Sequence, residues 1–251
     1  MAARRDLATD REVVAGLAVV RLGTAFFRRS LDRLSDRELD EPSLLPGWSR
    51  RHLLAHVGYN ARAVARLVTW AATGEETPMY SSPEARAEEI EVGSTLNAEA
   101  LRNLVEHAAI DLDVRWRDLP AERWDFPVVT AQGRRVPVSE TVWMRTREVW
   151  LHAIDLADGA RFDQVPAGVL SRLVGDVHAA WSRRPDLEPP ALTASGELGV
   201  ERWGDPDGAG AAVEGPLPAV AAWATGRMRA EAREGELRWK DAPPQPAPRW
   251  I

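Results

Sequence analysis

Four long stretches with apolar residues at helical spacing constrain the fold of this chain more than any other feature. They run from Asp10 to Leu34, from Ser49 to Thr73, from Pro83 to Leu119 with a break near Gly93, and from Ser139 to Gly159. Apolar side chains that recur every three or four residues lie on one face of a helix, and that face has to be buried. Four helices of this length therefore predict a helical bundle.

Proline, glycine and serine mark the start and end of the second helix. Pro42, Pro46 and Gly47 make the preceding segment a loop, because proline lacks an amide donor and glycine permits unusual turns. We expect Ser49 to cap the first turn, since a serine hydroxyl can accept a hydrogen bond from a free helical amide. We expect Gly74 to end the helix.

The chain changes character after Gly159. Short runs typical of strands alternate there with two predicted helices, at Pro166–Arg184 and Ala219–Met228. The expected strands are Ala191–Ala194, Leu198–Trp203, Ala211–Glu214 and Leu237–Trp239. A short hairpin is expected from 128–129 and 135–136, and an extended proline-rich tail over 242–248. The fold class is therefore mainly α, with a bundle over 1–160 followed by a small α+β domain over 161–251.

One pair of residues on the fourth helix is suited to binding a metal. Glu148 and His152 are one helical turn apart and point the same way. His56 lies in the apolar stripe of the second helix, between Leu53 and Val64. Because bundles place ligands on facing helices, the three side chains can converge in the interior. Two histidines and one carboxylate, with a fourth position open, are the ligand set of a catalytic zinc.

Each of these residues also has a purely structural interpretation. Glu148 and His152 can form an exposed polar pair that contributes a few tenths of a kcal/mol. His56 can be a core histidine with one hydrogen bond, because burying an imidazole without a partner costs roughly 1 to 3 kcal/mol. His107 and His178 are interpreted as surface or packing residues.

Composition narrows the classes of function. The chain has no cysteine, so it has no disulfide and any thiol chemistry needs a sulfur from outside. Its net charge of −6 and the lack of basic runs interleaved with aromatic residues argue against nucleic acid as a partner. No apolar run reaches the roughly 20 residues that span a bilayer, and the first residues do not form a signal peptide. We expect a monomeric, cytoplasmic protein that acts on small molecules.

Four motifs, taken together and in order, resemble the mycothiol-dependent maleylpyruvate isomerases. The motifs are Leu45–Ser49 (LPGWS), Leu53–His56 (LLAH), Arg147–Leu156 (REVWLHAIDL) and Trp223–Arg227 (WATGR). The resemblance implies a DinB-like four-helix bundle joined to a sterol-carrier-like α+β domain. It also implies zinc, or another divalent metal, held by His56, Glu148 and His152, with mycothiol as the thiol cosubstrate.

The resemblance further implies that arginines bind the acidic substrate and the thiol. Arg227, in the last helix, matches one of them within its motif, and Arg86, near the start of the third helix, matches another by approximate position. A guanidinium suits this task because it can bind a carboxylate through two parallel hydrogen bonds. Arg227 also has a structural interpretation, as a cation near the final carbonyls of the last helix.

The implied reaction is a cis–trans isomerisation. A metal-bound thiolate would add to the cis double bond of maleylpyruvate, the resulting single bond would rotate, and loss of the thiol would leave fumarylpyruvate. Two alternatives stay open. Another metal-requiring, mycothiol-dependent transferase would join the thiol to a different electrophile, and a non-enzymatic binding or regulatory protein would use the metal only for structure.

Overall fold

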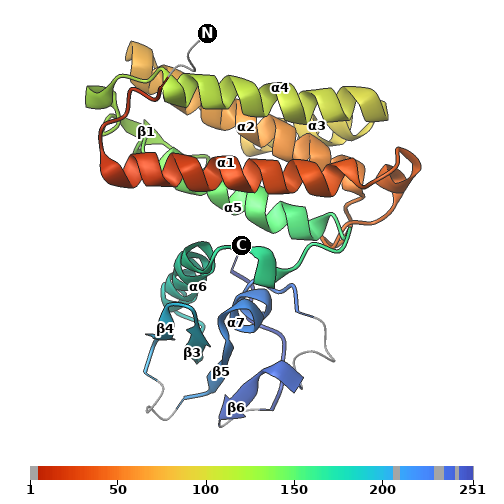
Figure 1. Ribbon diagram of the computed structural model, residues 1–251, viewed down its shortest axis with the longest axis vertical. Coiled ribbons are helices and arrows are strands. Elements are labelled where there is room, and N and C mark those ends of the chain that lie inside the picture. The colour runs from red at the N-terminus through yellow and green to blue at the C-terminus, as the bar shows by residue number, and fades with distance from the viewer. Residues whose placement is uncertain (1–4, 206–209, 229–234, 241–242, 251) are drawn as a thin grey trace. The chain divides into compact units, whose positions relative to one another are not determined.

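A computed structural model of the chain divides it into two compact units, Met1–Ala160 and Arg161–Ile251 (Figure 1). The structure describes residues 5–205, 210–228, 235–240 and 243–250. Each unit has its own buried apolar core. The predicted fold class, a helical bundle followed by a small α+β unit, is confirmed.

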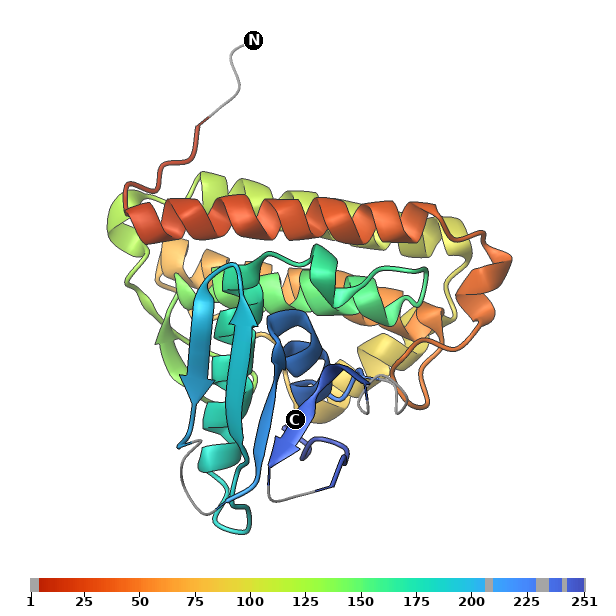
Figure 2. The same cartoon turned by 60° about the horizontal axis from the view of Figure 1, so that its bottom comes forward.

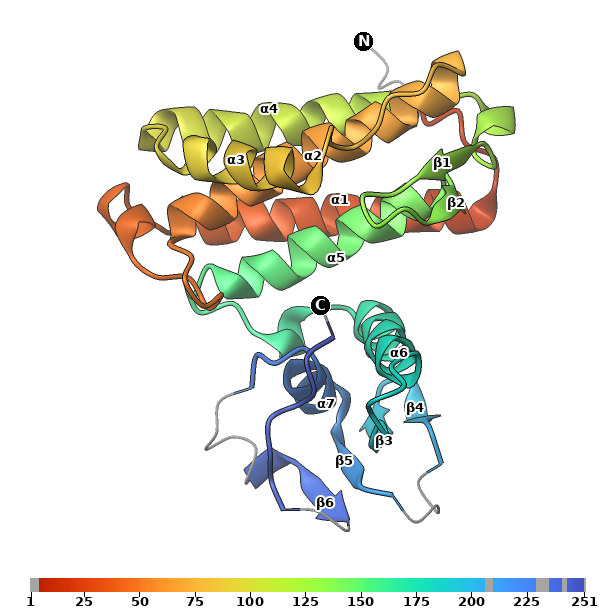
Figure 3. The same cartoon turned by 180° about the vertical axis from the view of Figure 1, so that it is seen from behind.

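Four long helices and one shorter helix form the first unit. They are α1 (Arg11–Asp32), α2 (Arg50–Thr73), α3 (Pro83–Ser94), α4 (Ala98–Arg117) and α5 (Glu140–Asp155). Helix α1 packs against α5, and α2 packs against α3, α4 and α5 (Figures 1 and 3). Because α2 contacts both α4 and α5, residues on its inner face meet residues from α5 in the interior. The predicted apolar stripes face inward, with fully or nearly fully buried members Leu17, Phe27, Leu53, Val64, Leu67, Leu101, Leu112 and Val149.

The ends of α2 are as predicted. The hydroxyl of Ser49 accepts a hydrogen bond from the amide of His52 at 3.5 Å. Gly74 follows the helix in the left-handed region, with φ of 82°, and its amide bonds the carbonyl of Trp70. This conformation satisfies the last carbonyls at little steric cost because glycine has no Cβ.

The third predicted helix is two helices, and a turn separates them. Helix α3 ends at Ser94, and Asn97 caps α4 by accepting a hydrogen bond from the amide of Ala100 at 2.8 Å. The predicted break near Gly93 has a packing reason. A Cβ added to Gly93 would lie 2.5 Å from the ring of Tyr59, so the glycine lets α3 approach α2 closely.

Short elements connect these helices. They are the 3₁₀ turns η1 (Arg37–Asp40) and η2 (Ala121–Arg123), and the strands β1 (Pro127–Val129) and β2 (Arg135–Pro137). A third 3₁₀ turn, η3 (Phe162–Gln164), lies at the start of the second unit. Strands β1 and β2 pair antiparallel with Val128 opposite Val136, which confirms the predicted hairpin.

Helix α5 is shorter than predicted, because it ends at Asp155 rather than near Gly159. Ala157 takes a φ of 56°, which ends the helical path. Buried Arg50 holds this end of α5 in place, since its guanidinium donates to the carbonyl of Leu156 at 2.6 Å and to that of Glu38 at 2.8 Å. The start of α2 and the end of α5 are thereby tied together.

The second unit is a four-stranded sheet with two helices packed on it. The helices are α6 (Ala167–Ser182) and α7 (Leu217–Ala224), and the strands are β3 (Ala191–Gly196), β4 (Gly199–Trp203), β5 (Ala212–Pro216) and β6 (Arg238–Lys240). The strand order is β4-β3-β5-β6, with β3 and β5 parallel and the other two pairs antiparallel (Figure 2). Helix α7 packs on β3 and β5, and α6 packs on β4.

All four expected strands are present, but the last helix is displaced and shorter. Helix α7 begins at Leu217 instead of Ala219 and ends at Ala224 instead of Met228. Gly226 has a φ of 75°, a left-handed conformation that stops the helix. No helix within the described ranges combines the length and apolar character that crossing a membrane requires.

Candidate metal centre

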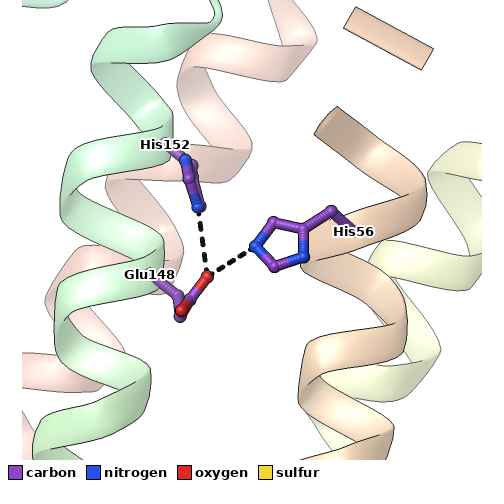
Figure 4. A group of neighbouring side chains, drawn as sticks. All are labelled: His56, Glu148 and His152. Carbon is purple, nitrogen blue, oxygen red and sulfur yellow. Dashed lines mark hydrogen bonds and ion pairs between the residues drawn. The ribbon is translucent and has the colours of Figure 1, made fainter. Parts of the chain in front are cut away.

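Three side chains from two helices converge inside the first unit (Figure 4). His56 comes from α2, and Glu148 and His152 come from α5. One carboxylate oxygen of Glu148, Oε2, lies 2.9 Å from Nε2 of His56 and 3.1 Å from Nε2 of His152. The three potential ligand atoms all lie within 4.8 Å of one another. The structure therefore brings together the residues that the sequence predicted to converge.

Local sequence and helix packing explain this convergence. The four-residue spacing puts Glu148 and His152 on one face of α5, and that face meets α2. His56 is flanked by fully buried Leu53 and Val57, so its ring is carried into the interior with the apolar stripe. The exposed fractions of the side chains are 7% for His56, 12% for His152 and 24% for Glu148. The exposed-pair interpretation of Glu148 and His152 is therefore not supported.

The three groups shift one another's pKa. Burial lowers the pKa of His56, although the nearby carboxylate of Glu148 opposes this. Burial alone would raise the pKa of Glu148, but the two imidazoles hold it well below its usual range. Burial alone would lower the pKa of His152, but hydrogen bonds to Asp155 and Glu148 outweigh it and raise that pKa to about 9. At neutral pH the cluster thus holds one carboxylate, one neutral imidazole and one imidazolium.

The donor set and its spacing fit a divalent metal ion. Ligand atoms about 2.0 to 2.1 Å from a tetrahedral zinc lie roughly 3.3 Å from one another. The two nitrogen–oxygen distances of 2.9 and 3.1 Å are within a few tenths of an ångström of that value. Two imidazole nitrogens and one carboxylate oxygen suit zinc and other first-row divalent metals.

A buried carboxylate lies behind one of the imidazoles. Nδ1 of His152 is 2.8 Å from Oδ2 of Asp155, whose side chain has no exposed surface. Our sequence analysis missed Asp155, although its three-residue spacing from His152 places both on the same helical face.

Other groups from the first unit border the cluster. Nη2 of Arg86, on α3, lies 3.4 Å from Nδ1 of His56. The ring of Trp48 lies 5.4 Å from that of His56, centroid to centroid. Burial raises the pKa of Tyr80 to about 12, and the charges of Arg86 and Glu148 also act on its hydroxyl. Tyr80 is a second residue that the sequence analysis missed, since it lies in a loop without regular spacing.

Arg227 belongs to the second unit. It follows α7, and its Nη1 donates a hydrogen bond to the carbonyl of Thr225 at 2.9 Å. That contact agrees with the interpretation of Arg227 as a cation near the helix end. His107 is exposed on α4 and His178 is partly buried on α6, as expected of surface or packing residues.

Comparisons with known proteins agree with the resemblance carried by the motifs. Residues 20–157, more than half of the chain, match the family described as the mycothiol maleylpyruvate isomerase N-terminal domain. A crystal structure of the mycothiol-dependent maleylpyruvate isomerase is 43% identical with a TM-score of 0.86, over 95% of this chain and 97% of that chain. The crystal structure of a mutant of that isomerase is 42% identical with the same TM-score and coverage. No curated protein sequence matches. Because both the sequence match and the structural match extend over most of its length, the chain belongs to the mycothiol maleylpyruvate isomerase family.

Proposed function

We propose that this protein is a mycothiol-dependent maleylpyruvate isomerase that requires a divalent metal ion. One observation carries the proposal: a three-donor cluster lies in a chain that matches such an isomerase over nearly its whole length. The match includes both units, so the proposal does not rest on the bundle alone.

We propose that His56 and His152 bind zinc, or another divalent ion, through their Nε2 atoms, and that Glu148 binds it through Oε2. Three protein ligands leave a fourth position for a small molecule, which distinguishes a catalytic zinc site from a structural one. The chain has no cysteine and therefore no thiolate of its own. A metal ion held at this site would make a thiolate from an external thiol, because a thiol that coordinates the metal is deprotonated at neutral pH.

The proposed reaction regenerates the thiol. Addition of the thiol converts the substrate's cis double bond into a single bond that can rotate, and loss of the thiol leaves the trans isomer. The atoms balance without an oxidant, a reductant or a net proton. The protein's task is therefore to hold the substrate and the thiol in contact.

Two arginines are proposed to bind the acidic groups of the substrate and the thiol. Arg86 presents its guanidinium next to His56, so a carboxylate bound to it would lie beside the metal centre. Arg227 is the proposed contribution of the second unit, on the strength of its motif. Guanidinium groups suit carboxylates because their fork of donors matches both oxygens. Trp48 would provide an apolar wall next to His56.

Metal analysis of the purified protein, followed by an assay, tests this function. We expect about one divalent ion per chain, and turnover of maleylpyruvate that needs both mycothiol and the metal. Stripping the metal with a chelator should abolish turnover, and restoring zinc should recover it. The absorbance of the product reports the rate. Turnover that survives complete removal of the metal would contradict the proposal.

The fate of the thiol separates isomerase from transferase. In an isomerase, mycothiol acts in catalytic amounts and its free concentration stays constant while substrate is consumed. In a mycothiol-dependent transferase with the same metal site, the thiol disappears as a stable thioether accumulates. Thiol-dependent turnover of either kind would exclude a non-enzymatic binding or regulatory protein. The DinB-like and sterol-carrier-like descriptions of the two units, the cytoplasmic location and the monomeric state stay predictions.

A further inference from the structure

The two imidazoles of the metal centre differ in what their second nitrogen faces. Both Nε2 atoms face Oε2 of Glu148. Nδ1 of His152 faces the carboxylate of Asp155 at 2.8 Å, whereas Nδ1 of His56 faces the guanidinium of Arg86 at 3.4 Å. One ring therefore has an acceptor behind it, and the other has a donor.

This difference sets which nitrogen of each ring carries the proton. An ionised carboxylate only accepts hydrogen bonds, so Asp155 requires a proton on Nδ1 of His152. When a metal replaces the proton on Nε2 of this ring, the proton on Nδ1 stays in place, and this is the form that binds a metal through Nε2. A guanidinium only donates, so Arg86 favours a lone pair on Nδ1 of His56. That form puts the proton on Nε2, and the proton must move to Nδ1 before a metal can bind Nε2.

We propose that Asp155 is the positioning residue of the metal centre. Its carboxylate fixes the orientation of the His152 ring and keeps a proton on Nδ1, so that Nε2 is the atom that binds the metal, whereas no carboxylate supports His56 in this way. The inference rests on the proposed metal site. The same difference has a consequence for Arg86. When His56 binds a metal through Nε2, its Nδ1 gains the proton, and Arg86 loses an acceptor and becomes available to a substrate carboxylate.

The surroundings of Asp155 suit a positioning role. Its side chain has no exposed surface, and its backbone carbonyl accepts a hydrogen bond from the amide of Leu44 at 2.9 Å. Arg50 holds the next residue, Leu156, through its carbonyl. An acidic side chain at the last residue of a helix is unfavourable next to the negative end of the helix dipole. The hydrogen bond with His152 offsets this cost.

Zinc affinity of two matched variants tests the proposal without measuring activity. Each variant changes the group behind one imidazole: Asp155→Asn removes a charge and keeps the shape, and Arg86→Gln removes a donor cation. Competition with a chromogenic chelator measures the dissociation constant for zinc. We expect Asp155→Asn to weaken zinc binding by about 10- to 100-fold, the usual effect of removing such a partner. We expect Arg86→Gln to bind zinc as tightly as the unaltered protein, or more tightly.

Two outcomes would overturn the proposal. One is an unchanged zinc dissociation constant in Asp155→Asn, and the other is an equal weakening in both variants, which would mean that any disturbance behind a ring matters equally. Because the readout is zinc binding, it is separate from the proposed reaction. A protein that binds zinc as expected but does not turn over maleylpyruvate would contradict the proposed function and leave the role of Asp155 intact.

A spectroscopic measurement on the unaltered protein covers the case in which Asp155→Asn does not fold. In the zinc-loaded protein with ¹⁵N-labelled histidine, His152 should show a proton on Nδ1, shifted downfield by its bond to a carboxylate and slow to exchange. The His107→Gln variant, altered at an exposed position, controls for assignment. A proton on Nε2 of His152, with the metal absent from that atom, would contradict the proposal.

Discussion

The two units of this protein differ in how many polar side chains they bury. Of the ten buried polar side chains among the described residues, only Thr225 belongs to the second unit. The first unit buries two guanidinium groups, those of Arg50 and Arg145, in addition to the imidazole of His56. Nη1 of Arg145 donates to the carbonyl of Val57 and to Oδ1 of Asn60, and burial lowers its pKa to about 10. Such groups are tolerated inside a protein only when they have partners.

The core of the second unit contains a chain of three tryptophan rings. The rings of Trp181, Trp223 and Trp239 follow one another at centroid distances of 5.8 and 5.4 Å, in edge-to-face geometry. The indole nitrogens of Trp181 and Trp223 donate to the carbonyls of Pro248 and Gln245. The described tail residues 243–250 contain no helix or strand, as predicted, and these bonds hold the tail to the core.

Because of this difference, we expect similar substitutions to have different consequences in the two units. In the first unit three polar side chains, those of His56, Glu148 and His152, converge on one site, so a substitution there should change chemistry. In the second unit the buried rings support packing, so a substitution there should change stability.

Loss of a proposed metal ligand should have the largest effect. We expect His152→Ala to lose bound metal and thiol-dependent turnover together, because two remaining donors do not form a stable zinc site. Metal analysis and the isomerase assay measure both properties. The exposed His107→Ala on α4 is the matched control and should keep both. If His152→Ala turns over substrate at the normal rate, the claim that the first unit carries the chemistry through this site is wrong.

Loss of a buried ring in the second unit should act on stability alone. Trp181 has no exposed surface and contacts Trp223. Trp181→Ala should lower the free energy of unfolding by about 3 to 5 kcal/mol through the cavity it leaves. Denaturant unfolding measures this change. The fraction that stays folded should bind its full complement of metal, and a folded fraction without metal would show that the second unit also supports the metal site.

Substitution of Arg227 tests whether the second unit contributes to the chemistry at all. We expect Arg227→Ala to lower kcat/KM for maleylpyruvate by roughly 10- to 150-fold, since a hydrogen bond to a charged group contributes about 1.5 to 3 kcal/mol. Arg227→Lys should recover only part of the loss, because an ammonium cannot bind a carboxylate through two parallel bonds. Metal content should stay normal in both variants. Unchanged kcat/KM would mean that Arg227 only caps its helix.

Residues at regular spacing were predictable from the sequence, and residues whose partners are distant in the chain were not. The convergence of His56, Glu148 and His152 followed from two local facts: the four-residue spacing of Glu148 and His152, and the place of His56 in an apolar stripe. Arg50 was not predicted to be buried, because the carbonyls that accept its hydrogen bonds come from segments on either side of α2. Arg86 was suggested by resemblance alone, since its contact with His56 depends on how α3 packs on α2.

Helix ends were also only partly predictable from the sequence. The end of α2 was predictable because Gly74 is a known stop signal, and Gly226 offered the same signal for α7, although the predicted helix ran past it. The end of α5 was not predictable. Ala157 takes a left-handed conformation that alanine rarely adopts, and nothing in its own side chain favours it.

Zinc affinity should depend on pH because His152, in the first unit, has to lose a proton when it binds the metal. Because the pKa of His152 is raised to about 9, a metal ion that binds at neutral pH has to displace one proton from this ring. His56 has a lowered pKa and Glu148 a strongly lowered one, so neither should release a proton at neutral pH. Zinc affinity should therefore rise roughly tenfold per pH unit from neutrality up to about pH 9 and then level off. Calorimetry in buffers of different ionisation enthalpy should detect about one proton released per ion; an affinity that is flat over this range would contradict the assignment.

Two glycines offer the smallest and most closely matched test. Gly74 ends α2 with φ of 82°, and Gly226 follows α7 with φ of 75°, and a Cβ added at either position would have no neighbour within 4 Å. Alanine at either position should therefore lower the free energy of unfolding by about 1 to 2 kcal/mol, from backbone strain alone. Their effects on activity should differ. Gly226 directly precedes Arg227, so Gly226→Ala should also raise the KM for maleylpyruvate. Gly74→Ala should leave the KM unchanged, because Gly74 lies at the end of α2, about five turns beyond His56. Denaturant unfolding and steady-state kinetics on the pair separate the two effects, and an equal change of KM in both variants would show that Arg227 does not depend on the turn that presents it.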